Sequence, residues 1–263
     1  MNTTTSTLTI LASAKTNERI PIMKTNVFLK IDRMDMHAVH CLRFWLETFK
    51  DYPTWILCDR TEEDGSRPTI LDTCFLDYPQ TKFTASDRSL VTYLSELKPR
   101  KRNMATANLT GFELSKNNSD NFWMIDADDT QFLTHRWDAL NDKLHSAEQY
   151  LVEHSLDGFS LDFYSTHNAG WTFGVALFRS DLHWTELTQI KGDEMRDFMF
   201  PRNIDAAFHC MREKKLWKLE SFVFSGMSFQ HVYNNYPEMV NGVYYWNKGM
   251  LWDIPLPKRI VSL

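Results

Sequence analysis

Short apolar runs alternate with amphipathic helical segments along most of this chain, and this alternation restricts the possible folds more than any other feature. The run VFLKID at 27–32 is typical of a buried strand, and apolar residues recur at helical spacing over 37–50. A second strand is predicted for TWILCD at 54–59. Strand–helix–strand units of this kind form parallel sheets that are covered by helices. We therefore expect an α/β fold with a mixed, mostly parallel sheet flanked by helices.

The same pattern continues toward the C-terminus. Helical patterns begin at Asp87, with a break at Pro99, and again over 136–154 and near Asn203. Further strands are predicted at 69–75, 122–126, 157–165, 171–179 and 216–224. Residues 1–25 are rich in Thr and Ser, so we expect an N-terminal extension that is disordered or adds an edge strand. Residues 26–263 would then form a single domain.

Net charge and cysteine content restrict the function. The formal net charge of −5 argues against nucleic acid as a partner, because phosphate contacts need a basic surface. The four cysteines are scattered without a CxxC pair, which predicts reduced, buried thiols of a cytoplasmic protein. No apolar run approaches the ~20 residues that a membrane span needs, and the N-terminus does not resemble a signal peptide.

The stretch NFWMIDADDT at 121–130 leads an apolar run directly into three acids, Asp126, Asp128 and Asp129. Carboxylates this close repel one another and raise each other's pKa unless positive charge lies between them. A metal ion, a basic side chain or water could supply that compensation. Two carboxylates at i and i+2 can bind a hard cation and leave coordination positions open for phosphate oxygens.

Two further acids follow predicted strands. Asp32 and Asp59 stand at the carboxyl ends of the first two strands. The carboxyl ends of parallel strands meet at one edge of a sheet, and open α/β sheets bind ligands at that edge. We expect both residues to converge there with the acids at 126–129.

The order of these elements, ending in FWMIDADD, resembles that of the GT-A-fold nucleotide-sugar glycosyltransferases. It is most similar to their large inverting, family 2-like group, which carries a DxD motif. GWTFGVALFRSDL at 170–182 resembles the strand on the acceptor side of that family, and NIDAAFHCMREKKLWKL at 203–219 resembles its segment with the catalytic acid. The likeness covers about residues 26–231, and only the DADD segment is specific.

The resemblance implies roles on the donor side. Asp59 would contact the nucleotide base or ribose, with Lys30 and Asp32 beside it. Asp126 would lie near the ribose and the metal, and Asp128 would bind Mn²⁺ or Mg²⁺ at the donor diphosphate. Residues 26–130 would form the nucleotide-binding half.

The resemblance also implies roles on the acceptor side. Asp205 would be the general base that deprotonates the acceptor hydroxyl, or it could simply cap the helix that follows. His231 would be a further metal or diphosphate ligand, or an ordinary loop histidine. Trp171 could stack on an acceptor sugar or pack in the core. Residues 131–263 would form the acceptor-binding half with a C-terminal tail.

The implied function is metal-dependent transfer of a hexosyl or N-acetylhexosaminyl group, with inversion, from a nucleotide-diphosphate sugar. UDP is the favoured nucleotide, and the acceptor would be a hydroxyl of a glycan or glycolipid. By analogy with the family, the enzyme would work in polysaccharide biosynthesis in the cytoplasm, with peripheral association at the inner face of the membrane.

Two other functions remain open from the sequence. DADDT also fits the nucleophile loop of haloacid-dehalogenase-like phosphatases, with Asp126 as nucleophile and Asp128 as acid/base. GDEMRD at 192–197 would then supply Mg²⁺ ligands through Asp193 and Asp197. However, that nucleophile normally follows the first strand, and WTELTQIK before Gly192 is a poor strand. A non-catalytic sugar- or nucleotide-binding module is the other alternative.

Overall fold

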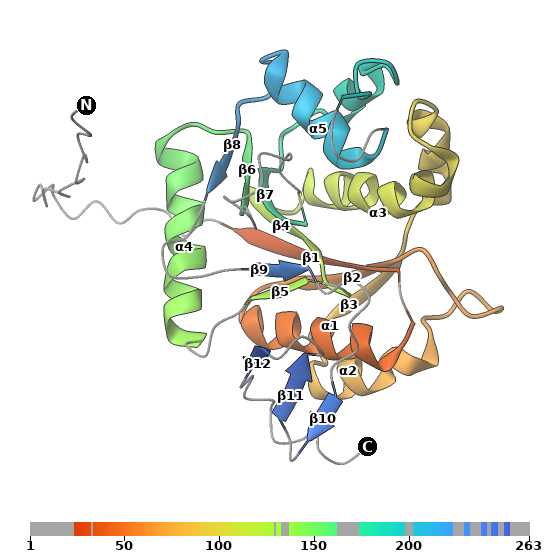
Figure 1. Cartoon of the computed structure of the whole chain (residues 1–263), viewed down its shortest axis with the longest axis vertical. Coiled ribbons are helices and arrows are strands. Elements are labelled where there is room, and N and C mark those ends of the chain that lie inside the picture. The colour runs from red at the N-terminus through yellow and green to blue at the C-terminus, as the bar shows by residue number, and fades with distance from the viewer. Residues whose placement is uncertain are drawn as a thin grey trace, which may run out of the picture.

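A seven-stranded mixed sheet forms the centre of the molecule in the computed structural model of this 263-residue chain (Figure 1). The structure describes residues 24–32, 34–128, 130–132, 137–161, 174–197, 202–222, 229–231, 238–240, 243–246 and 250–252. The strand order is β3-β2-β1-β4-β7-β6-β8. The strands of this sheet are β1 (Thr25–Ile31), β2 (Thr54–Cys58), β3 (Lys82–Ala85), β4 (Asn121–Asp126), β6 (Gly158–Leu161), β7 (Val175–Arg179) and β8 (Leu219–Phe222).

Parallel pairing dominates this sheet. β1 pairs in parallel with both β2 and β4, β2 pairs in parallel with β3, and β6 pairs in parallel with β8. In the described part of the sheet only β7 is antiparallel, between β4 and β6. The mixed, mostly parallel sheet with flanking helices confirms the predicted α/β class and is consistent with a GT-A type of fold.

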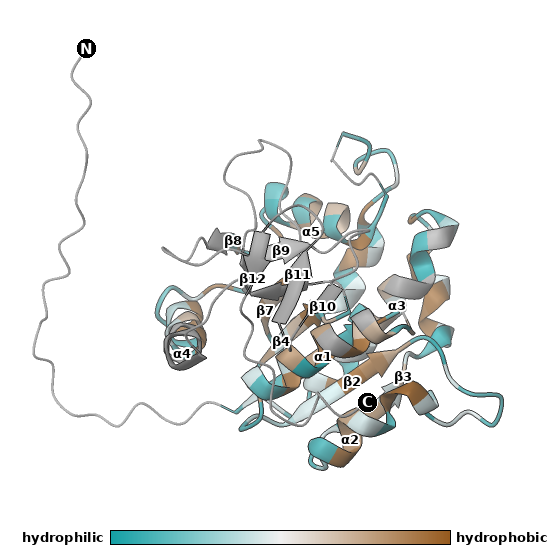
Figure 2. Ribbon diagram, turned by 60° about the horizontal axis from the view of Figure 1, so that its bottom comes forward, coloured by the Kyte–Doolittle hydropathy of each residue, from teal (hydrophilic) through white to brown (hydrophobic). Residues whose placement is uncertain are grey.

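Helices cover both faces of the sheet. The helical segments are α1 (Met36–Thr48), η1 (Thr69–Leu71), α2 (Asp72–Asp77), η2 (Arg88–Leu94), α3 (Pro99–Ser115), α4 (Trp137–Glu153), η3 (Trp184–Gln189) and α5 (Ile204–Glu213), where η marks a 3-10 helix. Side chains of α1, α2 and α4 pack on one face, and side chains of η2, α3, η3 and α5 pack on the other. The flanking helices carry both hydrophilic and hydrophobic residues (Figure 2), as expected of helices that pack one face on the sheet and expose the other.

The alternation of side chains along the strands accounts for these two cores. In β4, Trp123 and Ile125 belong to the core under α1 and α4, whereas Phe122 and Met124 belong to the core under α3 and α5. Successive strand residues point to opposite faces, so an unbroken apolar run is what a sheet covered on both sides needs. Asp126 follows Met124 at this spacing and falls on the α3 side.

Helix α3 packs closely on β4 at Gly111. A Cβ atom at Gly111 would lie 2.3 Å from Met124 Cε, so a larger residue there would displace the Met124 side chain or the helix. Ser115, one turn later, is fully buried. Gly111 and Ser115 thus allow α3 to pack closely on the strands.

The predicted strand at 69–75 is wrong. This segment is helical, as η1 and α2, and the third strand is β3. Leu71 and Cys74 are the buried apolar residues here, and their spacing of three suits one face of a helix rather than a strand. β3 has the polar sequence KFTA because it is an edge strand, so it lacks the apolar run of an inner strand. The helix predicted from Asp87 is also shorter than expected and is the 3-10 helix η2.

Smaller sheets follow in the C-terminal part. β5 (Thr130–Phe132) pairs with β9 (Phe229–His231), and β10 (Glu238–Val240), β11 (Val243–Trp246) and β12 (Met250–Trp252) form an antiparallel sheet. The four cysteines are free and buried, as expected. Within the described residues, none of the helices has the length and apolar character needed to cross a bilayer.

Candidate active site at the carboxyl edge of the sheet

Residues 126–128, called the acidic turn below, close the end of β4 onto the neighbouring strand β1. Asp126 is the last residue of β4, and the Ala127 N–H donates to the Lys30 carbonyl at 2.8 Å. Asp128 is buried, and its Oδ2 atom accepts the Asp32 N–H at 2.7 Å. The acidic turn is thus fixed to the carboxyl end of β1 rather than extended into solvent.

A basic side chain compensates the first acid of the turn. Lys30 Nζ lies 2.5 Å from Asp126 Oδ1 and donates to Asn108 Oδ1 at 2.9 Å. The Lys30 side chain is only 9% exposed, so the ammonium group is held between β4 and α3. Of the three possible compensations for the clustered acids, a basic side chain supplies the one for Asp126. The sequence did not indicate that Asn108 would accept a hydrogen bond from Lys30. The one signal for it is a polar residue on a helix face of small and apolar residues.

The ends of β1 and β2 add a second acidic pair. Burial and the neighbouring carboxylate of Asp32 raise the pKa of Asp59 above its ordinary value. The Oδ1 atom of Asp59 is buried and has no hydrogen-bond partner among the described residues. Arg60 Nε lies 3.6 Å from Asp32 Oδ1, and Arg88 donates to the Asp59 carbonyl at 2.6 Å. The two arginines, which the sequence had not singled out, partly offset the negative charge.

The oxygen donors of the acidic turn suit a hard divalent cation. Mg²⁺ is typically bound through one or two carboxylates together with substrate phosphates, and Asp126 and Asp128 offer two carboxylates from one short turn. Within the described residues no group of three His, Cys, Asp or Glu side chains could hold a metal by itself. The two carboxylates Asp126 and Asp128 are of the type that binds a hard cation together with a phosphate-bearing ligand.

The backbone of His231 lies beside the acidic turn. In the antiparallel pairing of β5 with β9, His231 is opposite Thr130, two residues after Asp128. A residue a hundred positions later in the sequence is thereby brought next to the turn. The side chain of His231 lies outside the described residues, as do Asp129 and Trp171.

Asp205 is in the first turn of α5, on the same face of the sheet as Asp126. It is not the helix cap, because Asn203 is the N-cap and its Oδ1 accepts the Ala206 N–H at 2.9 Å. Asn203 Nδ2 also donates to Asp205 Oδ2 at 3.1 Å. Just before the cap, the Arg202 carbonyl accepts the Lys98 N–H at 2.9 Å, so the N-termini of α5 and α3 lie together.

Residues 192–197, which would supply the Mg²⁺ ligands of a phosphatase, do not follow a strand as that function would need. Gly192 follows the 3-10 helix η3 rather than a strand, and residues 192–197 form turns. β4, which leads into the acidic turn, is an inner strand and the fourth along the chain. These observations disfavour the phosphatase reading.

No protein-family model matches the sequence, and no curated protein matches it. Solved structures show likeness at low identity. A mannosyltransferase from Pyrobaculum calidifontis in complex with GDP-Man and Mn²⁺ aligns with a TM-score of 0.43 and 11% identity, over 77% of this chain and 57% of that chain. The galactosyltransferase LgtC in complex with donor and acceptor sugar analogues gives 0.48 and 9%, over 74% and 72%. The glycosyltransferase GlyE from Streptococcus pneumoniae TIGR4 gives 0.41 and 9%, over 76% and 45%. At TM-scores below 0.5, these likenesses carry no weight for function.

Proposed function

We propose that this protein is a metal-dependent glycosyltransferase that uses a nucleotide-diphosphate sugar, with UDP as the favoured nucleotide. The observation that carries the proposal is the acidic turn, which is fixed to β1 through Asp128 and compensated at Asp126 by Lys30. It lies at the carboxyl edge of a mostly parallel sheet, where folds of this class bind nucleotides. Two carboxylates that a short turn presents at this edge suit a metal-assisted transfer better than a binding module without chemistry.

The donor nucleotide would bind along the ends of β1 and β2. The buried Asp59 Oδ1 atom lacks a hydrogen-bond partner among the described residues, and an N–H or O–H group of a base or ribose would supply one. The raised pKa of Asp59 favours its neutral form, which can donate as well as accept a hydrogen bond. Asp32 and Lys30 lie beside it on β1 and would complete the donor site.

Asp126 and Asp128 would hold Mn²⁺ or Mg²⁺, with His231 as a further ligand. When bound, the cation supplies neutralisation of the charge that develops on the leaving diphosphate. Lys30 keeps Asp126 oriented toward the edge of the sheet. Asp205 would take the proton of the attacking acceptor hydroxyl, and Asn203 Nδ2 orients its carboxylate. A base opposite the donor suits direct displacement, and hence inversion at the sugar.

The same proposal covers the sugar that is transferred, the acceptor and the location of the enzyme. A hexosyl or N-acetylhexosaminyl group would be transferred to a hydroxyl of a glycan or glycolipid, with Trp171 on the acceptor side. A glycolipid acceptor would bring the enzyme to the inner, cytoplasmic face of a membrane as a peripheral protein, for polysaccharide biosynthesis. Assays with matched free and lipid-linked acceptors would separate these cases.

A thermal-shift screen of UDP, GDP, ADP and CDP, each with and without Mn²⁺, tests the central proposal. Stabilisation by one nucleoside diphosphate that requires Mn²⁺ is the expected result, because a ligand that binds only the folded state raises its stability. If no nucleotide raises the melting temperature with either Mn²⁺ or Mg²⁺, the transferase proposal is wrong. Nucleotide binding without hydrolysis or transfer of any sugar would instead favour the non-catalytic module.

A further inference from the structure

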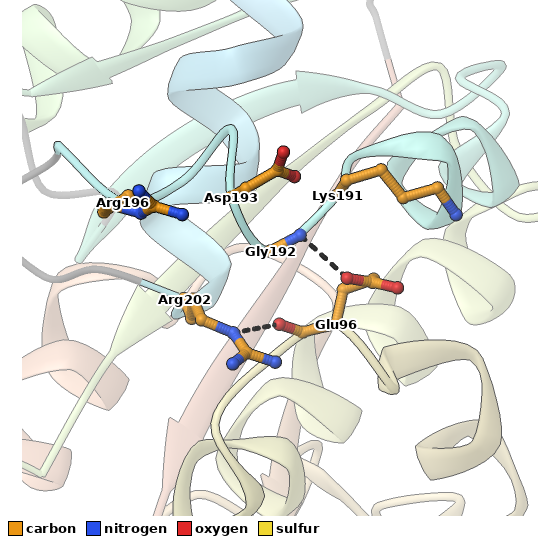
Figure 3. Close-up of a pocket in the computed structure, with 6 residues that line it drawn as sticks. All are labelled: Glu96, Lys191, Gly192, Asp193, Arg196 and Arg202. Atoms are coloured by element: carbon orange, nitrogen blue, oxygen red, sulfur yellow. Dashed lines mark hydrogen bonds between the residues drawn. The ribbon is translucent and has the colours of Figure 1, made fainter.

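A second polar pocket lies at the joined N-termini of α3 and α5. It is an open pocket of about 430 Å³, and we call it the basic pocket; Figure 3 shows its lining residues, which are Glu96, Lys191, Gly192, Asp193, Arg196 and Arg202. Three cationic side chains and two carboxylates line it, in a protein whose net charge is −5. The lining thus carries one more positive than negative charge, which favours an anionic ligand over a neutral one at this point.

The cations of this pocket form few internal ion pairs. Within the described part of the chain, Arg196 and Arg202 form no salt bridge with a carboxylate, and Lys191 acts on the Glu194 carboxylate only from beyond salt-bridge distance. The contact of Arg202 is a hydrogen bond from Nε to the Glu96 carbonyl at 2.8 Å, which fixes the plane of the guanidinium group (Figure 3). A planar guanidinium held in this way is suited to bind a phosphate or carboxylate through its remaining N–H groups.

The backbone around the pocket is shaped to bring Arg202 inward. Arg202 has φ +58°, a left-handed conformation that side-chain-bearing residues rarely adopt. A Cβ atom at Gly192 would lie 2.8 Å from Arg202 Nε, so a larger residue there would displace the Arg202 side chain from this position. The Gly192 N–H donates to Glu96 Oε2 at 2.7 Å, which anchors the opposite wall. Strained backbone of this kind persists where the surrounding structure holds it, and often at binding sites.

The basic pocket borders the proposed acceptor side. Arg202 immediately precedes Asn203, the cap of α5, which orients the carboxylate of Asp205. The Arg202 carbonyl also binds the Lys98 N–H, so the pocket wall and the first turn of α5 form one unit. A molecule anchored in the pocket would therefore extend along the N-terminal turn of α5, where the proposed base lies.

We propose that the basic pocket binds the anionic group of a carbohydrate acceptor, meaning a sugar that carries a phosphate. Lys191, Arg196 and Arg202 would contact the phosphate oxygens, and the carboxylates of Asp193 and Glu96 would accept hydrogen bonds from sugar hydroxyls. This mixture of cations and acids suits a charged sugar better than a bare anion. The inference rests on the proposed function only where it calls the sugar an acceptor. Binding of a sugar phosphate does not require that function.

Titration calorimetry with glucose 1-phosphate, glucose and inorganic phosphate tests this proposal. The protein should carry Asp128→Asn in each case, so that binding at the acidic turn is impaired and does not obscure the pocket. We expect glucose 1-phosphate to bind more tightly than phosphate, and glucose not to bind measurably. Arg202→Gly is the sharpest variant, because glycine accepts the positive φ and the change removes only the side chain.

Arg202→Gly and Arg196→Ala should each raise the Kd for glucose 1-phosphate about tenfold or more, since a hydrogen bond to a charged group contributes on the order of 1.5–3 kcal/mol. Lys116→Ala is the matched control, because Lys116 is exposed and follows α3 at the opposite end of that helix. It should change the Kd less than about twofold, as expected of a distant surface charge. An unchanged Kd in both arginine variants, or no binding of the sugar phosphate, overturns the proposal.

Vesicles of phosphatidylglycerol separate a lipid headgroup from a soluble sugar phosphate. Binding to vesicles that both arginine variants lose, without binding of glucose 1-phosphate, would reassign the pocket to lipid and overturn the carbohydrate inference. The outcome is distinguishable from that of the nucleotide screen. A protein that binds nucleotide with Mn²⁺ but no sugar phosphate keeps the transferase and loses the pocket, and the reverse result keeps the pocket alone.

Discussion

The negative charges of two acids, Asp126 at the end of β4 and Glu148 on α4, are compensated in different ways on the two faces of the sheet. On the α3 face, Asp126 is 35% exposed and pairs with the ammonium group of Lys30. On the α4 face, Glu148 is 8% exposed, and its Oε1 accepts the Trp123 Nε1–H at 2.9 Å. His145 Nδ1 lies 3.7 Å from its other oxygen, and this contact is an ion pair only when the histidine is protonated.

This difference separates a structural acid from a candidate functional one. Burial raises the pKa of Glu148, and the hydrogen bond from Trp123 and the nearby His145 oppose that rise only in part. Glu148 is thus a polar group enclosed by a core. Asp126 instead keeps a full counter-charge and an open side at the edge where ligands bind. Glu148 is enclosed among core side chains, whereas Asp126 is half-buried at the edge of the sheet where folds of this class bind ligands.

The largest expected effect comes from the acidic turn. Asp128→Asn should abolish the joint stabilisation by nucleoside diphosphate and Mn²⁺, because an amide is a poor ligand for a hard cation. That stabilisation should be about 2.7 kcal/mol at ~100 Kd of ligand in the unaltered protein. Sugar transfer should fall by about a hundredfold or more, since charge neutralisation at the leaving group contributes several kcal/mol to catalysis. Thermal shift and a transfer assay measure the two effects.

Asp120→Asn is the control for that change. Asp120 lies just before β4 at the opposite edge, and its Oδ2 accepts the Lys24 N–H at 2.9 Å, a bond that an asparagine oxygen can also accept. It should leave both the nucleotide stabilisation and the transfer rate unchanged. Equal losses in the two variants would mean that the turn at 126–128 has no special role.

A smaller effect is expected from Lys30→Met. Methionine fills the space of the aliphatic stem but removes the charge, so Asp126 and Asn108 both lose their contact with the ammonium group. Breaking a buried ion pair costs about 3–5 kcal/mol, and the partial exposure of Asp126 reduces the expected loss to about 2 kcal/mol of unfolding free energy. Urea denaturation gives the value.

A double-mutant cycle with Asp126→Asn checks the cause. If the pair is responsible, the double variant should be less destabilised than the sum of the two single variants. Strict additivity would show that Lys30 acts through packing rather than through Asp126. The contrast between the two faces of β4 would then lose its basis, because Asp126 would be no more specifically held than Glu148.

Much of this edge could be predicted from local sequence, and the pairing within it could not. Strand ends at Asp32, Asp59 and Asp126 follow from apolar runs, and the common direction of β1, β2 and β4 brings them together. The Lys30–Asn108 contact depends on how deeply α3 lies on the sheet, which Gly111 and Met124 determine. No periodicity encodes that depth. Edge strand β3 could not be located from the sequence for a related reason. Its own pattern is polar, and its strand conformation depends on pairing with β2.

The smallest expected effect is a gain of stability on the α4 face. Because the pKa of Glu148 is raised in the folded state, its favourable contribution is present at low pH and is lost as the pH rises through the folded pKa. Glu148→Gln resembles the protonated form and can still accept the Trp123 N–H. It should therefore be more stable than the unaltered protein at pH 7, by a few degrees in Tm if the gain is about 1 kcal/mol. The gain should shrink as the pH falls toward 4.

Among the described residues, three side chains affect the charge of Glu148, and they bear on how this result is interpreted. Trp123 comes from β4, His145 from its own helix, and Tyr52, whose hydroxyl lies 3.0 Å from His145 Nδ1, from the loop after α1. The contact with His145 is an ion pair only when that ring is protonated, and such a pair would favour the charged carboxylate. The Tm difference should therefore be followed over the whole pH range rather than at one pH. Glu153→Gln, an exposed acid on the same helix, is the control and should show no such pH dependence. If Glu148→Gln is instead less stable at pH 7, the buried carboxylate is charged and held by His145. Both faces of β4 would then stabilise their acids through a cation, and only exposure would distinguish the site from the core.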